Sequence, residues 1–340
     1  MDTIDRYARQ TQLTEVGAKG QARLMASSVL VLGCGALGSN LASLLTRAGV
    51  GRIRVVDRDI LELNNLQRQV LFDEGDVAAG LPKAEAAARR LRRINSAVEV
   101  EAQVSDATSR NIERMLDGIN LLVDGTDNLE TRYLLNDVCV KLGMPWIYGG
   151  VIGTTGMSMT IVPGEGPCLR CVFPSPPPPG SLPTCETRGI LGTLPAAIAA
   201  VQATEAIKLL CGGERSPSLL SLDLWRQTVQ QVKVLRDDQC PTCGQRRFEF
   251  LDADRAASVS TLCGRSAIQI TPAEEVRLDL NRLAADLSSL GQVSHNGLLL
   301  QFKPAGGDLE LVLFPDGRML VRGTTSEAAA RALYARYVGT

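Results

Sequence analysis

The 340-residue sequence contains a single histidine, His295, and aromatic residues make up only 4% of the chain. One histidine cannot supply a Ser-His-Asp triad and a second histidine-dependent site together, and it excludes an HExxH protease motif and a two-histidine iron site. A zinc site would have to be built mostly from cysteine thiolates. Because 45% of the residues are hydrophobic and few are aromatic, we expect large cores of aliphatic side chains.

Neither sign of charge is in excess, because 36 Lys and Arg face 37 Asp and Glu. This balance gives no global field for nucleic acid or an anionic membrane, so we expect neither as a partner. The longest apolar stretch, 194–210, is interrupted by Gln202, Glu205 and Lys208, which argues against a membrane span. The polar start, Met1–Asp5, shows no secretory signal, so we expect a cytoplasmic protein. Its nine cysteines then indicate metal or redox chemistry and not a disulfide framework.

Short apolar strands alternate with helical patterns through the first 150 residues. Strands are expected at 28–32, 53–56, 98–103, 120–124 and 146–149, and helices from about 37 and at 83–94, 109–116 and 129–142. On the first helix, the 3.6-residue spacing places one apolar face at Leu37, Leu41, Leu44, Leu45 and Ala48. Such alternation implies right-handed crossovers, so it predicts a doubly wound, Rossmann-like α/β fold with a mostly parallel sheet.

After residue 150 the pattern changes, and we expect the sheet to continue with antiparallel strands. These strands are expected at 155–162, 219–224 and 228–235, around a helix at 194–210. A proline-rich segment at 173–183 can be neither helix nor central strand. The remaining elements predict a small α+β domain: helices at 273–289 and 326–337, and strands at 297–302, 309–314 and 319–322. We therefore divide the chain into a domain at 1–246 and a second, of unknown role, at 247–340.

A glycine-rich turn is the first candidate site. Gly33-x-Gly35-x-x-Gly38 follows the first expected strand and opens a helix, and Asp57 ends the next strand 19 residues beyond. The glycines let the backbone approach a phosphate, the helix N-terminus offers N–H donors, and Asp57 can accept from ribose hydroxyls. On these residues alone an NAD enzyme, an ATP enzyme and a tight turn without a ligand all remain open.

Charged residues further along favour nucleotidyl transfer over hydride transfer. Lys83 stands at a helix N-terminus, where its charge opposes the helix dipole unless it faces an anion. Arg68 lies in a polar segment, 64–69, and Asp127 follows a strand at the carboxyl edge of the sheet, where ligands of such folds bind. Cations and a magnesium-binding aspartate suit a reacting phosphoryl group. The alternative is that Arg68 and Lys83 are ordinary surface cations.

Two CxxC pairs form the second candidate site. Cys168-Leu-Arg-Cys171 and Cys240-Pro-Thr-Cys243 supply four thiolates, which is the ligand set of a tetrahedral zinc site. Because all four ligand positions would be filled, we expect the Zn²⁺ to be structural and not catalytic. A redox role for either pair is the alternative.

Taken together, these motifs resemble the MoeB/ThiF adenylyltransferase family, the prokaryotic relatives of the ubiquitin-activating enzymes. The resemblance covers about residues 6–245. It is carried by Arg6–Gln10, Gly33–Gly38, Asp57-x-Asp59, Asn64–Gln69, Gly80-x-Pro82-Lys83, Thr126-Asp127-Asn128, both CxxC pairs, Thr184-Cys185 and Gln202–Lys208. One departure is Ala36, where a glycine is usual; a methyl group should be tolerated there if the local φ is negative.

The resemblance implies an activity, its cofactors and its site residues. The C-terminal Gly-Gly carboxylate of a small ubiquitin-like sulfur-carrier protein would attack the α-phosphate of ATP, leaving an acyl-adenylate and pyrophosphate. By the same resemblance Asp57 binds the ribose, Asn65, Arg68 and Lys83 hold the phosphates, Asp127 holds Mg²⁺, and Arg9 reaches the phosphates from the neighbouring subunit of a homodimer. The full nucleotide-binding set would be Gly33, Gly35, Ala36, Gly38, Asp57, Asp59, Asn64, Asn65, Arg68, Gln69, Lys83, Asp127 and Asn128.

Cys185 is the thiol with two open interpretations. It lies beside the proline-rich segment with Arg188 close by, and a neighbouring cation can raise the thiolate fraction of a cysteine. In thiamine-type relatives this cysteine forms a persulfide-linked intermediate with the carrier, whereas molybdopterin-type relatives do not depend on it. A loop cysteine without chemistry is the alternative.

The resemblance leaves the pathway and the partners open. Thiamine or molybdopterin biosynthesis would use such an enzyme, and a cysteine desulfurase is a candidate sulfur donor. Adenylation of another peptide or tRNA carboxylate is one competing hypothesis, an NAD-dependent oxidoreductase is another, and a catalytically silent scaffold is a third. The scaffold is disfavoured because the phosphate-site residues are all present.

Overall fold

The structure is a computed structural model, which describes residues 6–177, 185–252, 258–261, 267–272, 276–306 and 309–339. The chain divides into two compact units, Met1–Ala253 and Asp254–Thr340. Residues 247–252 belong to the first unit, where Phe248, Phe250 and Leu251 pack on its hydrophobic core. The candidate site residues also lie in the first unit.

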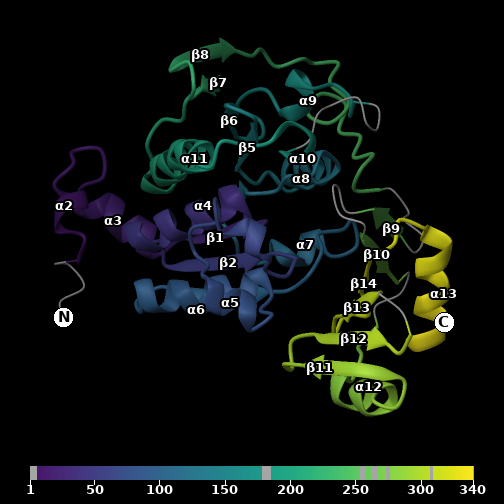
Figure 1. Ribbon diagram of the computed structural model, residues 1–340. Helices are drawn as coiled ribbons and strands as arrows, with labels where there is room; N and C mark the ends of the chain where they lie inside the picture. Colours follow the sequence, from purple (N-terminus) through teal and green to yellow (C-terminus); the bar gives the residue numbers. More distant parts are fainter. Residues whose placement is uncertain are drawn as a thin grey trace. The chain divides into compact units, whose positions relative to one another are not determined.

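The first unit is built on one eight-stranded sheet (Figure 1). In spatial order its strands are β3 (Glu99–Gln103), β2 (Arg52–Val56), β1 (Ser28–Leu32), β4 (Leu121–Asp124), β5 (Trp146–Ile152), β6 (Thr155–Ile161), β7 (Ser218–Asp223) and β8 (Thr228–Lys233). The strands from β3 to β5 are parallel, and β6, β7 and β8 continue the sheet in antiparallel pairing. This is the predicted doubly wound sheet with an antiparallel continuation. The strand order reverses between β1 and β4, the place where such folds bind ligands.

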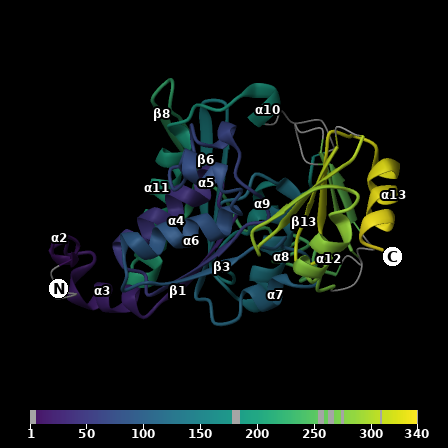
Figure 2. The ribbon, with the colours of Figure 1, turned by 60° about the horizontal axis from the view of Figure 1, so that its bottom comes forward.

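Helices cover both faces of the parallel part (Figure 2). On one face lie α4 (Ala36–Ala48), α6 (Lys83–Ile94) and α11 (Leu194–Cys211). On the other lie α7 (Ile112–Met115) and α8 (Leu129–Leu142), whose apolar side chains join those of β1 and β4 in one core. The shorter helices of this unit are α2 (Ala8–Thr11), α3 (Gly17–Met25), η1 (Leu63–Asn65), α5 (Glu74–Ala78), α9 (Leu169–Val172) and α10 (Cys185–Arg188).

The central strands are buried on both faces, which explains their continuous apolar sequences. Residues 29–32 of β1 and all of β4 are buried, in register as Val29 with Leu121 and Leu32 with Asp124. One expectation for α4 was wrong. Leu44 is exposed, whereas the other four residues of the predicted apolar face are buried. Its position on the helix lies at the margin of the buried stripe, where the spacing alone does not separate core from surface.

The helix α11 is, among the described residues, the one long and apolar enough by composition to cross a membrane. Half of it is buried inside the protein, against α3, α4, β5 and β6. Its polar residues have partners there. Glu205 accepts from Thr160 Oγ1 at 2.9 Å and Ser216 N at 2.8 Å, and Gln202 Nε2 donates to Asp124 O at 2.9 Å. The polar residues that interrupt the apolar stretch therefore hold α11 against the sheet.

The second unit is a six-stranded antiparallel sheet with two helices on one face. Its strands, in spatial order, are β11 (Gly291–His295), β12 (Leu300–Pro304), β13 (Glu310–Leu313), β14 (Met319–Arg322), β10 (Ala267–Thr271) and β9 (Ser258–Thr261). The helices are α12 (Leu280–Leu287) and α13 (Glu327–Tyr337). The sequence analysis missed β9, β10 and β11, and it placed the start of α12 too early. The Asp279 side chain caps that helix by accepting from Asn281 N, so 276–279 are not helical.

Candidate functional site

The glycine-rich turn between β1 and α4 packs directly on the turn that follows β4. Gly33 has φ +82°, and a Cβ there would lie 2.8 Å from the carbonyl atoms of Gly125. A Cβ on Gly38 would lie 1.8 Å from Gly33 O. At Gly35, by contrast, the nearest atom would be Gln69 Nε2 at 3.8 Å. Packing therefore requires glycine at 33 and 38, whereas Gly35 leaves space that a ligand can enter.

Ala36 is the first residue of α4 and takes an ordinary helical conformation. The positive φ angles of described non-glycine residues occur at Gln227 and Arg246. The methyl group of Ala36 is therefore accommodated without backbone strain. The N-cap residue of this helix is Gly35, which has no side chain to accept from the N–H groups of the first turn.

Asp57, at the end of β2, is buried and held by two backbone donors. Its carboxylate accepts from Cys34 N at 2.6 Å and from Asp59 N at 2.7 Å. Burial raises the pKa of Asp57 above its ordinary value, although the ammonium of Lys83 opposes the shift. The carboxylate is thus fixed at the mouth of the glycine-rich turn, because Cys34 belongs to that turn.

Lys83 is almost completely buried at the start of α6, with 4% of its surface exposed. Its Nζ lies 2.9 Å from Asp59 Oδ2, and its backbone N donates to Asp59 O at 2.9 Å. The expectation that Lys83 faces an anion is met within the chain by Asp59. This carboxylate compensates the unfavourable position of a cation at a helix N-terminus.

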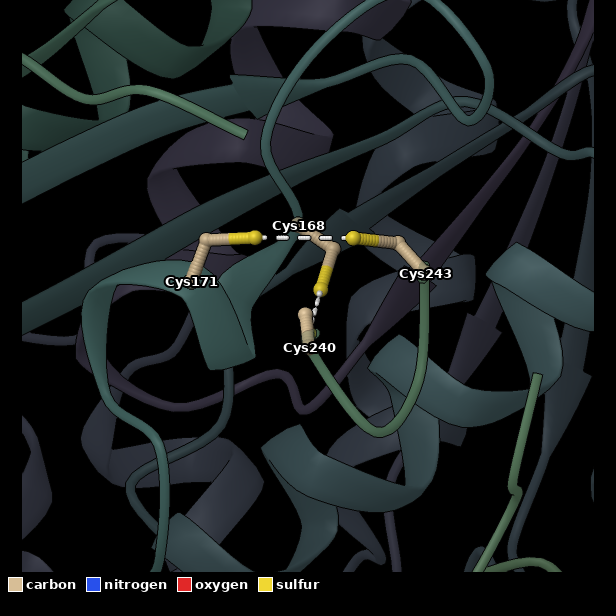
Figure 3. Close-up of side chains that lie close together, drawn as sticks. All are labelled: Cys168, Cys171, Cys240 and Cys243. Atoms are coloured by element: carbon tan, nitrogen blue, oxygen red, sulfur yellow. Dashed lines mark hydrogen bonds between the residues drawn. The ribbon is translucent and has the colours of Figure 1, made fainter. Parts of the chain in front are cut away.

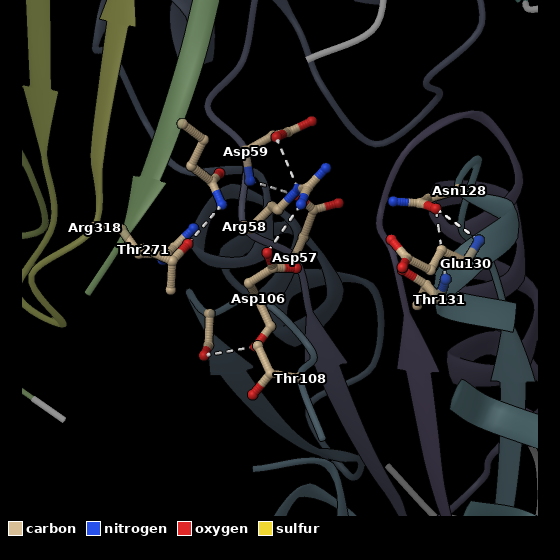
Figure 4. Close-up of polar contacts among 12 residues, drawn as sticks. Asp57, Arg58, Asp59, Asp106, Thr108, Asn128, Glu130, Thr131, Thr271 and Arg318 are labelled. Carbon is tan, nitrogen blue, oxygen red and sulfur yellow. Dashed lines mark hydrogen bonds and ion pairs between the residues drawn. The ribbon is translucent and has the colours of Figure 1, made fainter. Parts of the chain in front are cut away.

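A second charged pair, missed by the sequence analysis, lies at the same edge of the sheet (Figure 4). Arg58 donates to Asp106 Oδ2 at 2.9 Å, which joins the segment after β2 to the segment after β3. Burial lowers the pKa of Arg58, but Asp106, Asp59 and Asp127 together raise it above its ordinary value. The position of Arg58 between two predicted site aspartates was the sequence signal that could have singled it out.

The segment 64–69 makes hydrogen bonds within itself and to the preceding Glu62. Asn65 is buried, its Oδ1 accepts from Glu62 N at 3.3 Å, and its Nδ2 donates to Asn64 Oδ1 at 2.8 Å. Arg68 donates to Asn64 O at 2.9 Å. Within the described part of the chain, Oε1 of Gln69 is buried without a hydrogen-bond partner. Because the Gln69 amide lies next to the space at Gly35, this unsatisfied oxygen fits a site completed by a ligand.

The turn after β4 carries Asp127 and Asn128. Asn128 caps α8, with Oδ1 accepting from Glu130 N at 2.8 Å and from Thr131 N at 3.5 Å (Figure 4). Asp127 is exposed, and its carboxylate makes no hydrogen bond or ion pair with another described residue. Its charge raises the pKa of both Arg58 and Arg132, so it faces the same region as these two cations. An exposed carboxylate beside buried ones is available to bind a cation.

Arg9 is not brought to this site within its own chain. It is exposed on α2, where its contact is with Gln12 Oε1 at 3.5 Å. The neighbouring Gln10 Nε2 donates to Ala48 O at 2.9 Å, which places α2 beside the last residue of α4. The glycine-rich turn is at the other end of that helix, about 20 Å away for its 13 residues.

The four cysteines of the two CxxC pairs converge on one point (Figure 3). Cys168 Sγ lies 3.6 Å from Cys240 Sγ, Cys171 Sγ lies 3.4 Å from Cys243 Sγ, and all four sulfurs are within 4.8 Å of one another. A tetrahedral ion with metal–sulfur bonds of about 2.3 Å separates its ligands by roughly 3.8 Å. The residues therefore fit a tetrathiolate zinc site.

The helix α8 holds both cysteine pairs through two polar residues that the sequence analysis missed. Asn136 Nδ2 donates to Cys168 Sγ at 3.6 Å, and its Oδ1 accepts from Leu169 N at 2.9 Å. Asp137 accepts from Thr242 Oγ1 at 2.9 Å and from Phe250 N at 2.8 Å. Two adjacent polar residues inside an apolar helix pattern were the signal that the sequence offered. Such outer contacts orient metal ligands.

Cys185 begins α10, but its side chain lies outside the described residues, so its predicted chemistry is not tested by a contact. Arg188, at the end of α10, is exposed, and its Nε is 3.5 Å from where a Cβ on Gly153 would lie. Ile190 then forms a parallel bridge with Gly153. The segment after Cys185 is thus attached to the connection between β5 and β6.

A model of the ThiF family matches residues 7–242 of this sequence. The chain belongs to the ThiF family. It is 41% identical over 337 residues to the sulfur carrier protein ThiS adenylyltransferase of Bacillus subtilis, covering 98% of this chain and 99% of that protein. It is also 42% identical over 250 residues to the sulfur carrier protein adenylyltransferase of Thermus thermophilus, covering 72% of this chain and 92% of the relative.

Solved structures agree with the ThiF fold. The crystal structure of E. coli MccB with ATP has a TM-score of 0.62 at 24% identity, covering 70% of this chain and 74% of MccB. At this identity the likeness concerns the fold. The family match ends near Cys243, whereas the likeness to the B. subtilis relative extends through the second unit.

Proposed function

We propose that this protein uses ATP to adenylate the C-terminal Gly-Gly carboxylate of a small ubiquitin-like sulfur-carrier protein, for sulfur incorporation in thiamine or molybdopterin cofactor biosynthesis. The observation that carries the proposal is the 41% identity to a sulfur-carrier adenylyltransferase over 98% of the chain. The first unit is the ATP-binding unit in this proposal.

In the reaction, a carboxylate oxygen of the carrier attacks the α-phosphorus of ATP, and the bond to the β-phosphate oxygen breaks to release pyrophosphate. A C-terminal carboxylate is already ionised at pH 7, so no general base is needed. This agrees with a site that offers cations and carboxylates and holds no histidine. Catalysis is then positioning and electrostatic stabilisation of the phosphates.

The proposed residue roles are those that the family resemblance implies. Asp57 accepts from the ribose hydroxyls, while Asn65, Arg68 and Lys83 hold the phosphates at the glycine-rich turn. The buried Lys83 is the residue that an NAD-dependent oxidoreductase would not need. Gly33, Gly35, Ala36 and Gly38 form the phosphate turn, and Asp59, Asn64, Gln69 and Asn128 support it.

Asp127 is the proposed ligand of Mg²⁺. Its exposed carboxylate, which makes no hydrogen bond or ion pair with another described residue, supports this assignment, whereas the carboxylates of Asp57 and Asp59 are already engaged. When bound, Mg²⁺ supplies charge neutralisation at the phosphates. The four cysteines hold a structural Zn²⁺, with no position left open for catalysis.

Arg9 supports a homodimer. It lies beside the end of α4 that is far from the glycine-rich turn of its own chain. We therefore assign it to the phosphates bound by the partner subunit. The other proposed partner is a sulfur donor such as a cysteine desulfurase, and we place the protein in the cytoplasm.

ATP–pyrophosphate exchange tests the proposed function. Exchange should require a carrier ending in Gly-Gly, and a carrier lacking these two residues is the matched control. Equal exchange with both carriers, or exchange only with an unrelated peptide or tRNA, would contradict the proposed substrate. No exchange with any carboxylate, together with NAD binding, would favour the oxidoreductase.

Cys185→Ala tests the covalent role when sulfur transfer is measured beside ATP–pyrophosphate exchange. If Cys185 forms a persulfide-linked intermediate, the variant should keep adenylation and lose sulfur transfer to the carrier. The half-buried Cys211→Ala is the matched control and should keep both. Full sulfur transfer by Cys185→Ala would reject the covalent role.

A further inference from the structure

The turn that carries Asp127 is held from inside the protein by Arg132, a residue of α8 to which the function above assigns no role. Its side chain is buried, with 8% of the residue exposed. Nε lies 2.9 Å from Asp124 Oδ2, and the guanidinium also donates through NH2 to Thr126 O at 2.6 Å. One planar group therefore joins the end of β4 to the peptide that precedes Asp127.

Asp124 holds Thr126 through two other groups, its backbone N–H and its hydroxyl. Its Oδ1 accepts from Thr126 N at 2.9 Å and from Thr126 Oγ1 at 2.7 Å. The N–H, the hydroxyl and the carbonyl of Thr126 are thus all engaged by one buried ion pair. On the far side of Asp127, the Asn128 side chain fixes the first turn of α8. Asp127 lies between two fixed neighbours, although its own carboxylate makes no hydrogen bond or ion pair with a described residue.

A buried ion pair in the core is the simpler interpretation of Arg132, and two observations go beyond it. The ring of Tyr148, 5.3 Å from the guanidinium carbon, and Asp124 already surround the arginine, yet its third contact is the carbonyl next to Asp127. The turn after β4, which Arg132 and Asp124 hold, also packs through its backbone on the glycine-rich turn. A Cβ on Gly125 would be 2.4 Å from Gly33 O, so a shift of the turn after β4 would displace the glycine-rich turn.

We infer that Arg132 is a positioning residue for the metal site: by fixing Thr126 O, it directs the Asp127 carboxylate toward the cation that accompanies ATP. The inference rests on the proposed function in one respect, namely that Asp127 binds this cation. The guanidinium of Arg132 does not touch substrate or cofactor. It acts through the peptide between Thr126 and Asp127.

The test is Mn²⁺ binding to the full-length protein in the presence of ATP, measured by electron paramagnetic resonance without any carrier. Arg132→Lys keeps a cation beside Asp124, but a single ammonium cannot reproduce the two-sided fork of a guanidinium. We expect about tenfold weaker Mn²⁺ binding, as for outer-shell changes at other metal sites. ATP binding without metal should change much less. Lys141→Ala removes an exposed cation of the same helix as Arg132, one that pairs with Glu113 of α7, and should leave Mn²⁺ binding unchanged.

A double-mutant cycle separates positioning from general loosening of the fold. In an Asp127→Asn background, where the metal ligand is already lost, Arg132→Lys should weaken Mn²⁺ binding no further. Additive effects would overturn the inference, and so would unchanged Mn²⁺ binding in folded Arg132→Lys. If Arg132→Lys fails to fold, Thr126→Val is the substitute test. It removes only the hydroxyl contact with Asp124, so Mn²⁺ binding should weaken by a smaller factor. Because no carrier is present, failure of the proposed substrate would leave these outcomes unaffected.

Discussion

Lys83 and Asp59 are joined twice, once between side chains at 2.9 Å and once between backbone N and O at 2.9 Å. The proposed phosphate-binding lysine therefore has a carboxylate partner before any nucleotide arrives. A phosphate at this site has to share the ammonium with Asp59 or displace it. The same ion pair links the end of β2 to the start of α6, so it contributes to stability as well as to the site.

Lys83→Met tests this dual role. Loss of a preorganised phosphate donor should slow adenylation by 10²- to 10³-fold, about 3–4 kcal/mol of transition-state stabilisation. Removing one member of this largely buried pair should also cost on the order of 1–3 kcal/mol in the free energy of unfolding, less than for a fully buried pair because Asp59 is partly exposed. Urea denaturation and exchange assays measure the two effects. Arg89→Ala, which breaks an exposed pair with Glu85 on the same helix, should change each very little.

Substitutions of the glycines separate packing from ligand access. Gly38→Ala would place a methyl group on Gly33 O, so we expect a large loss of stability and of ATP binding together. Gly35→Ala finds space in the protein and should keep the melting temperature within a few degrees while it weakens ATP binding. Calorimetric titration with ATP and thermal denaturation distinguish the two. Equal melting temperatures for both variants would contradict the packing argument.

The cysteine cluster predicts one zinc ion per chain. Elemental analysis should find it, and removal by a strong chelator should lower the melting temperature, since binding to the folded site contributes to folding free energy. Cys171→Ser should lose the metal, whereas Cys211→Ser, which changes a thiol outside the cluster, should retain it. A metal-free protein with unchanged stability would reject a structural zinc site.

The pH dependence of stability should include a contribution from Glu101 on β3. Burial raises the pKa of Glu101, but Arg54 and Arg52 on β2 together hold it below its ordinary value. A lowered pKa in the folded state stabilises the protein above about pH 4, and this contribution disappears as the pH falls through the folded pKa. Glu101→Gln should therefore cost about 0.5–1 kcal/mol near pH 7, and its difference from the wild type should vanish in acid.

The matched control for this measurement is Glu99→Gln on the same strand. Glu99 is mostly exposed, and its oxygen lies 3.8 Å from Arg52 Nε. Its replacement should change stability by only a few tenths of a kcal/mol. If the loss of unfolding free energy in Glu101→Gln persists below pH 3, the loss comes from packing and not from the charge of Glu101.

The parallel core was predictable because its strands are buried on both faces and end in residues with special chemistry. β1 and α8 were predicted within a residue at each end, and the two CxxC pairs indicated their convergence directly. β9 to β11 were missed because each is only four or five residues long, and an alternating pattern over so few residues is weak. The partners of Lys83 and Arg132 were also unpredictable, since they depend on which loops meet at the edge of the sheet.

The helix α8 begins at the turn that carries Asp127 and holds the cysteine cluster through Asn136 and Asp137. About 12 Å of helix separates its cap, Asn128, from Asn136. Inserting a single residue in this interval would rotate one end by about 100° relative to the other, so both sets of contacts could not form together. The length of this segment is therefore fixed by geometry, even though most of its side chains do nothing but pack. Variation in length along the chain should be tolerated in surface loops and be absent between Asn128 and Asp137.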